Sequence, residues 1–199
     1  MNKKLFALIA ILCPLAFFFS CSTDDNNIVI DEEWKAYNEK QVADIDKSVY
    51  QSRESESKNG TIYFKYIDDY DAEITKTAST KITDTQTPYF TDSVAYRCEG
   101  FFLQKDGTKY IFQNDNNGYI LRGRVSDYID GMRTMLQNMQ KGKQVEVIIP
   151  YQLGYGTTDY YSTSASGTRY IAVPAYTTLR FKIYLIDIIP DNPGEFDQK

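Results

Sequence analysis

The feature that most constrains the fold is the spacing of apolar residues after residue 60. From Thr61 onward, aromatic and β-branched side chains repeat with a period of two, as in a strand with one buried face. Strands are therefore expected over residues 61–66, 93–103, 109–112, 118–121, 145–149 and 178–189. Because only one convincing helical segment interrupts these strands, the predicted fold class is α+β, with a multistranded antiparallel sheet.

The segment that interrupts the strands has helical spacing. Four apolar residues recur at intervals of three or four and so share one helix face: Ile129, Met132, Leu136 and Met139. Ser126 is expected to cap the start of this helix, and Gly142 is expected to end it. The helix is expected to lie across one face of the sheet.

The first twenty residues have the composition of a secretion signal. Lys3 and Lys4 precede an apolar run over residues 5–19, and about 15 apolar residues are too few to span a bilayer comfortably. Residues 18–21, Phe-Phe-Ser-Cys, resemble the lipobox of bacterial lipoproteins. Residues 1–20 are therefore expected to be a cleaved signal peptide, with Cys21 as the lipidated residue of the mature chain. An ordinary secretory signal is the alternative.

The residues after Cys21 bear on where the protein resides. Several acyl chains, such as palmitate, would anchor it stably, since each buried CH₂ contributes about 0.8 kcal/mol. We expect an outer-membrane lipoprotein of the bacterial cell envelope, attached to the membrane through its lipid. Ser22–Asp25 resembles the acidic tether that directs some lipoproteins to the cell surface, which is a weaker indication.

The remaining chain is expected to divide into four parts. Residues 21–30 are polar and read as a flexible tether. Residues 31–60 are expected to form a helical extension and linker, with the helix over Asp31–Ser48 and a polar stretch over 51–60. This helix could serve as a separable spacer or join two copies in a homodimer. The main domain is expected over 61–190, followed by a tail over 191–199.

Composition excludes several kinds of function. The chain has no histidine, so Ser-His-Asp triads, Cys-His pairs and His-ligated zinc sites are impossible. The net charge is −5, and no block of lysine and arginine offers the positive surface that nucleic-acid binding requires. No motif for a cofactor or metal is present, so none is expected. Once Cys13 is removed and Cys21 lipidated, Cys98 is the only free thiol.

Six sequence blocks resemble the FKBP-type peptidyl-prolyl cis-trans isomerases in order and spacing. They are 94–100, 106–110, 128–132, 139–142, 149–156 and 173–181, within a match that extends from Ile62 to Ile189. The segment Met139–Gly156 is the most specific. The helix that contains Trp34-Lys35-Ala36-Tyr37-Asn38 resembles the extension of lipid-anchored FKBP-like proteins from Bacteroides relatives. The resemblance implies an antiparallel sheet wrapped around one short helix, and proline-containing polypeptides as partners.

The resemblance also implies a set of site residues. The positions that match the catalytic part of the family's pocket are Tyr110, Tyr155, Ile129 and Phe181. Those that match its other substrate-binding positions are Tyr119, Tyr128, Met132, Ala172, Val173, Cys98 and Ile111. Tyr155 matches a tyrosine whose hydroxyl donates to the ligand, and Ile129 matches the residue whose N–H holds a ligand carbonyl. For each aromatic, a purely structural place in the core is the alternative. Residues 157–170 match a flap over the pocket and are expected to be a long loop that governs specificity, or else to be disordered.

Two positions depart from the family pattern together. Ile111 stands where the family has an aspartate, and Cys98 stands where it has the tyrosine that bonds to that aspartate. Losing both avoids a buried polar group without a partner, which would cost about 1–3 kcal/mol. The sequence therefore predicts a drier pocket and weakened isomerase catalysis. Two alternatives stay open: a non-catalytic peptide- or protein-binding module, and a structural or glycan-associated lipoprotein.

Overall fold

The computed structural model describes residues 30–68, 86–114 and 118–191. The expected signal peptide, the lipidation site at Cys21 and most of the tether lie outside the described residues, as does the tail after residue 191. No helix in the described ranges is long and apolar enough to cross a membrane.

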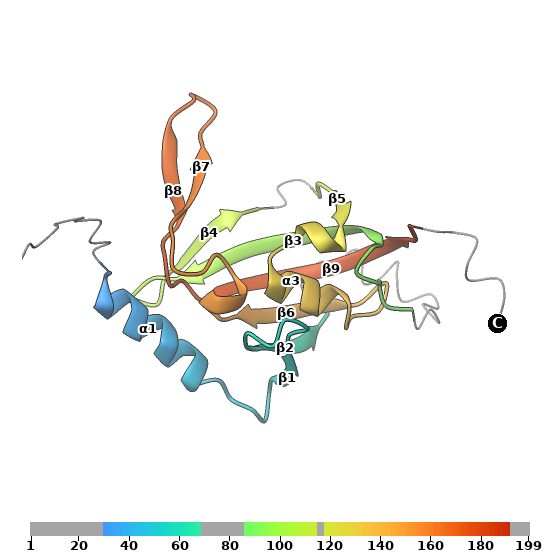
Figure 1. Ribbon diagram of the computed structural model, residues 1–199, viewed down its shortest axis with the longest axis horizontal. Coiled ribbons are helices and arrows are strands. Elements are labelled where there is room, and N and C mark those ends of the chain that lie inside the picture. Colours follow the sequence, from blue (N-terminus) through green and yellow to red (C-terminus); the bar gives the residue numbers. More distant parts are fainter. Residues whose placement is uncertain (1–29, 69–85, 115–117, 192–199) are drawn as a thin grey trace, which may run out of the picture.

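A seven-stranded sheet forms the main layer of the molecule (Figure 1). Its strands, in spatial order, are β1 (Gln51–Glu54), β2 (Thr61–Ile67), β6 (Gln144–Ile149), β9 (Leu179–Ile189), β3 (Ser93–Leu103) and β4 (Lys109–Gln113), and β5 (Leu121–Arg124) also pairs with β3. All neighbouring strands are antiparallel. The central strands of this sheet are β3, β6 and β9. Their buried residues are mostly apolar and either alternate with half-buried ones or follow one another along the strand.

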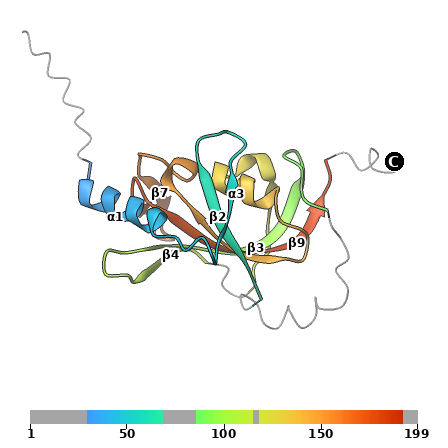
Figure 2. The same ribbon diagram turned by 90° about the horizontal axis from the view of Figure 1, so that it is seen from below.

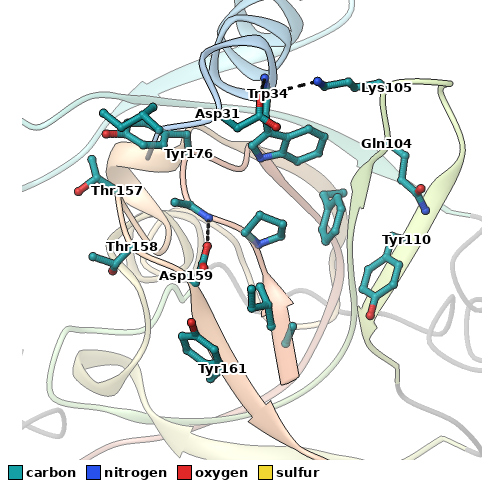
Figure 3. A pocket seen from close by; sticks show the side chains of 16 residues that line it. Asp31, Trp34, Gln104, Lys105, Tyr110, Thr157, Thr158, Asp159, Tyr161 and Tyr176 are labelled. Atoms are coloured by element: carbon teal, nitrogen blue, oxygen red, sulfur yellow. Dashed lines mark hydrogen bonds and ion pairs between the residues drawn. The ribbon is translucent and has the colours of Figure 1, made fainter. Parts of the chain in front are cut away.

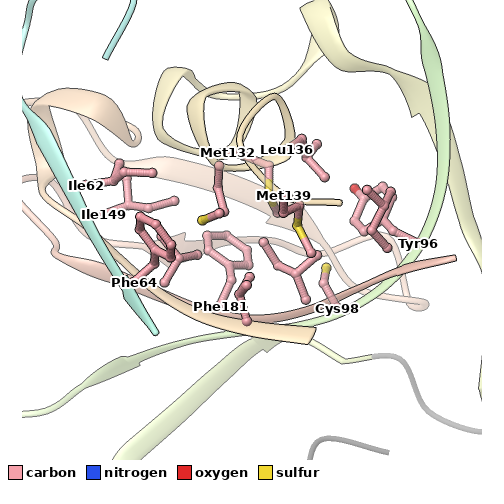
Figure 4. Packing of buried hydrophobic residues seen from close by; sticks show 14 of the residues in the cluster. Ile62, Phe64, Tyr96, Cys98, Met132, Leu136, Met139, Ile149 and Phe181 are labelled. Carbon is pink, nitrogen blue, oxygen red and sulfur yellow. The ribbon is translucent and has the colours of Figure 1, made fainter. Parts of the chain in front are cut away.

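The helix α3 (Asp130–Leu136) lies across one face of this sheet, after the short 3-10 helix η1 (Val125–Asp127). Its N-cap is Ile129, so the expected cap at Ser126 was wrong: the 3-10 turn separates Ser126 from the helix. Met132, Leu136 and Met139 are at most 3% exposed and point into the core (Figure 4). Gly131 lets the helix approach β6 closely, since a Cβ there would lie 2.3 Å from Cγ2 of Ile149.

Most of the expected strands are present, and three additional ones were not expected. The predicted strand over 93–103 has the bounds of β3, whereas the one over 118–121 lies three residues further along as β5. The additional strands are β1, β7 (Tyr160–Thr163) and β8 (Arg169–Val173). All four residues of β1 are exposed, and its conformation comes from pairing with β2. The polar stretch predicted as a linker therefore contains an edge strand.

The N-terminal helix α1 (Glu32–Ala43) begins at Asp31, whose carboxylate accepts from the Trp34 N–H at 2.9 Å. It ends five residues before the predicted end at Ser48. The helix packs against the segment before β9: the Trp34 Nε1–H donates to Thr177 Oγ1 at 3.1 Å. It lies at the end of the sheet that carries the β3–β4 turn (Figure 2), where the Tyr37 hydroxyl donates to the Gln104 carbonyl at 2.6 Å.

Strands β7 and β8 form a separate two-stranded sheet that projects from the main body (Figure 1). The hairpin that they form, residues 160–173, includes residues 160–170 of the range 157–170 in which a long loop or flap was expected. Tyr160 pairs with Val173, and after an irregularity Tyr161 pairs with Ile171. The expected flap is therefore an ordered hairpin.

Candidate functional site

The floor of the candidate site is apolar and buried. Cys98 from β3, Met132 from α3, Phe181 from β9 and Val173 from β8 are each at most 3% exposed and belong to one core cluster. Figure 4 shows Met132, Phe181 and Cys98 between the helix and the sheet. The floor therefore offers no charged group and little access to water.

Half-buried side chains surround this floor and remain open to solvent on one side. Five of them pack against the core cluster: Phe112, Leu121, Tyr128, Ile129 and Tyr155. They come from β4, β5, the start of α3 and the turn after η2 (Tyr151–Leu153). A partly exposed aromatic rim over a dry floor is the form of a site for an apolar ligand.

Gly100 on β3 makes room for two aromatic walls. A Cβ at this position would lie 2.7 Å from Cε1 of Phe181 and 2.9 Å from Cζ of Phe112. Those two rings meet edge to face with centroids 5.6 Å apart. The absence of a side chain at Gly100 therefore lets the rings approach each other over the sheet.

Tyr155 supplies the hydroxyl group of this rim. Its ring stacks on Tyr160 with centroids 4.1 Å apart and meets the edge of Phe112 at 6.5 Å. Burial raises the pKa of Tyr155 to about 12, and the neighbouring Tyr160 and Cys98 add to the shift. The hydroxyl stays protonated at physiological pH, as an ordinary tyrosine does, and can donate a hydrogen bond to a ligand carbonyl.

Tyr128 and Ile129 border the site at the start of α3. The Tyr128 ring meets Tyr96 edge to face at 5.4 Å, and burial raises the pKa of Tyr128. Within the described part of the chain, the Ile129 N–H meets no hydrogen-bond acceptor. This donor at the expected position is available to a ligand.

Tyr110 and Ile111 do not lie in this site. They are 37% and 42% exposed and lie outside the core cluster, and it is Phe112 that meets Phe181 edge to face. The reason is an irregularity in strand pairing: Gly100 pairs with Gln113 while Phe101 pairs with Ile111, which leaves Phe112 as the bulged residue. Phe112 is therefore the residue of β4 that contacts Phe181, and Gln113 follows it.

Two other assignments also change. Tyr119 is 69% exposed and is not part of the cluster, whereas Leu121, which was not predicted, packs against it. Tyr160 was missed as well, because it lies on a hairpin that was expected to be a loop. The alternation of residues gives no signal for Leu121 on β5 or for Tyr160 on β7, since both positions depend on where the strands pair.

A pocket of about 950 Å³ lies beside the site, between α1, the β3–β4 turn and the base of β7–β8 (Figure 3). Tyr110 and Ala172, both predicted as site residues, line this pocket. Its other lining residues are Ile30, Asp31, Trp34, Phe102, Gln104, Lys105, Thr157, Thr158, Asp159, Tyr161, Ile171, Pro174, Ala175 and Tyr176. The neighbouring Val173 belongs to the core cluster, so the end of β8 connects the two regions.

The groups that the candidate site presents are suited to binding an apolar ligand. Cys98 is fully buried. No group of three or more cysteine, aspartate or glutamate side chains in the described ranges could hold a metal ion. The candidate site is therefore an apolar, aromatic surface that is partly exposed, with the Tyr155 hydroxyl and the Ile129 N–H at its rim.

Comparisons with known proteins agree with this geometry. The sequence profile of the FKBP-type peptidyl-prolyl cis-trans isomerase family matches residues 84–186. A comparison with curated protein sequences found no match.

Solved structures show the same fold. FkpA from Escherichia coli superposes with a TM-score of 0.51 at 22% identity, over 81% of this chain and 60% of the FkpA chain. A peptidyl-prolyl cis-trans isomerase from Pseudomonas syringae pv. tomato gives a TM-score of 0.52 at 21% identity, over 80% of this chain and 95% of that one. The predicted antiparallel sheet with a helix across it is thereby confirmed.

Proposed function

Because the chain belongs to the FKBP-type peptidyl-prolyl cis-trans isomerase family, we propose that it accelerates the cis–trans isomerisation of X-Pro bonds in extracytoplasmic polypeptides. The observation that carries this proposal is the partly exposed aromatic rim over the dry floor, with Tyr155 as a protonated donor. A proline-containing segment is the ligand that such an apolar surface suits.

The reaction requires no covalent group. Rotation about an X-Pro bond crosses a barrier of about 18–20 kcal/mol, because the partial double bond of the amide is lost in the twisted state. A site that binds the twisted amide better than either planar form lowers this barrier. Phe112 and Phe181 would enclose the proline ring, while the Tyr155 hydroxyl or the Ile129 N–H would hold a substrate carbonyl.

We further propose that catalysis is weaker than in family members with a tyrosine–aspartate pair. Cys98 replaces the tyrosine and is buried in the floor. Since Phe112 is the wall residue, the position after it is Gln113, which is neutral, as is Ile111. Either alignment lacks the carboxylate, so one polar contribution to stabilising the twisted amide is missing.

The place of action rests on the sequence of the first 25 residues. We propose that Cys21 carries a lipid and anchors the protein in the bacterial cell envelope, with the domain outside the cytoplasm. The native protein should then exceed the mass of residues 21–199 by the mass of the attached acyl groups, and Cys21→Ala should leave the membrane fraction. A Cys21→Ala variant that stays membrane-bound would contradict the anchor.

Isomerase activity can be tested with a proline tetrapeptide whose cis and trans forms are followed by NMR exchange. We expect the wild type to accelerate exchange and Tyr155→Phe to lower kcat/KM by about three- to tenfold, the equivalent of one lost hydrogen bond. Tyr66→Phe makes the same chemical change on β2 at a position that is 47% exposed, and it should leave the rate unchanged.

A non-catalytic binding module is the second candidate, and the replacement of the tyrosine by Cys98 favours it. It predicts that the tetrapeptide binds, and that Tyr155→Phe weakens binding, without any acceleration of exchange by the wild type. Acceleration by the wild type that Tyr155→Phe reduces would exclude this candidate.

A further inference from the structure

We propose that the pocket between α1 and the β7–β8 hairpin binds an apolar stretch of the same polypeptide whose proline occupies the candidate site. This proposal rests on the proposed function and adds a second subsite to it. The occupant is an extended segment with aromatic or aliphatic side chains, located about five residues from the proline.

The site and the pocket share one face of β3. Alternate residues of a strand point to the same side, so Cys98, Gly100 and Phe102 lie on one face of β3. Cys98 belongs to the floor of the site, and Gly100 lies under its aromatic walls. Phe102, which is 6% exposed, lines the pocket. A ligand on this face passes from one region to the other without crossing an edge of the sheet.

An aromatic series connects the two regions. Phe181 meets Phe112 at a centroid distance of 5.6 Å, Phe112 stacks with Phe102 at 6.4 Å, and Phe102 meets Trp34 at 5.8 Å. An extended chain advances about 3.3 Å per residue, so about five residues span these three steps. The length fits a single client segment that occupies both ends.

The charged groups at the pocket already have partners within the protein. Asp159 accepts from the Ala175 N–H at 2.8 Å, and this bond is drawn in Figure 3. Asp31 caps Trp34 and lies 3.8 Å from Nζ of Lys105. The surface left for a ligand is therefore mainly apolar and aromatic, which favours a neutral apolar segment over a charged one.

The hairpin contributes a matched pair of residues to this surface. Tyr161 and Ile171 face each other across β7 and β8 and both line the pocket, with 42% and 45% of their surfaces exposed. Tyr170, the neighbour of Ile171 in sequence, is 43% exposed and does not line it. Comparing a substitution of Ile171 with one of Tyr170 therefore separates effects on the pocket from general effects on the hairpin.

Trp34 is the only tryptophan of the chain and lines the pocket, so its fluorescence can report occupancy. The probes are tryptophan-free peptides with one proline and a Leu-Phe pair about five residues before or after it. Partner peptides carry Ser-Ser instead of Leu-Phe. We expect at least one Leu-Phe peptide to bind about tenfold more tightly than its partner and to change the Trp34 emission. Equal affinities for both pairs would overturn the proposal.

Variants of the hairpin complete the test. Ile171→Ser should reduce the advantage of the Leu-Phe peptide to about threefold or less, whereas Tyr170→Ser should retain it. Equal losses in the two variants would contradict a role for the pocket. Replacing the proline of the peptide by alanine should weaken binding, because one ligand is inferred to use both regions. Binding that ignores the proline would overturn that link.

The tetrapeptide exchange assay separates this inference from the proposed function. A tetrapeptide is too short to reach the pocket, so its isomerisation depends on the candidate site alone. Proline-dependent binding that changes Trp34 emission, without turnover of any peptide, would overturn isomerase activity and support joint binding by the candidate site and the pocket. Turnover of the tetrapeptide with no Leu-Phe advantage would overturn joint binding and support isomerase activity.

Discussion

Replacing Asn38 with alanine should lower the free energy of unfolding by about 2 kcal/mol, although Asn38 lies on a helix that was predicted to be a separable extension. The side chain is fully buried. Its Nδ2 donates to the Trp34 carbonyl at 2.8 Å, and its Oδ1 accepts from the Thr178 N–H at 2.8 Å. The Thr178 hydroxyl returns a bond to the Asn38 carbonyl at 3.1 Å.

The magnitude follows from what each partner loses. The buried Thr178 N–H would be left without its acceptor, at a cost of about 1–3 kcal/mol. Alanine is the better helix former by up to about 0.7 kcal/mol, which offsets part of this loss. For a chain of this size, 2 kcal/mol corresponds to a fall in Tm of about 4–8 °C.

Thermal unfolding followed by circular dichroism measures this shift. Asn59→Ala makes the same chemical change at an exposed position in the β1–β2 turn and should alter Tm by less than about 1 °C. Equal Tm values for Asn38→Ala and Asn59→Ala would refute the reasoning. They would mean that α1 is not held to the domain through this residue.

Three other perturbations have defined outcomes. Because Tyr155 stays protonated, the isomerisation rate should stay constant from pH 6 to 9. The free energy of unfolding should fall between pH 10 and 12, where tyrosines ionise in the unfolded chain but not in the folded one. Urea titrations should show a smaller fall for Tyr155→Phe. Gly100→Ala should cost about 1–3 kcal/mol and reduce the rate, because its Cβ would press on Phe181; an unchanged Tm would contradict the close packing. Cys98→Tyr with Gln113→Asp should raise the isomerisation rate above that of the wild type in the exchange assay. A double variant that folds but is no faster would argue that loss of the tyrosine–aspartate pair is not what weakens catalysis.

The sequence predicts those strands and helices in which the spacing of apolar side chains matches the buried face. The strand over 93–103 is one, since its alternate residues are buried against the core. Strands β1 and β8 carry no such pattern at their exposed positions, and they adopt strand geometry because a neighbour pairs with them. Local sequence alone does not contain that information.

The same distinction applies to the site. Among the residues that the resemblance implies, Phe181 and Met132 belong to the core cluster and Tyr155 packs against it. Phe112, and not Tyr110, meets Phe181, because the β3–β4 pairing contains a bulge that the pattern of residues around the turn does not reveal. The pocket beside the site depends on the contact between Trp34 and Thr177, 143 residues apart in sequence, and no local motif predicts such a contact.

The docking of α1 has a geometric consequence for a membrane-bound protein. A free helix of 12 residues would add about 18 Å to the distance between an anchor and the domain. Since α1 forms a wall of the pocket, only the ten residue-to-residue steps from Cys21 to Asp31 would separate a lipid from that wall, which is at most about 35 Å of extended chain. If Cys21 carries the proposed lipid, the candidate site and the pocket can bind polypeptides only within a thin layer along the bilayer. Polypeptides that emerge from or move along that membrane would then meet them at a far higher local concentration than those in free solution.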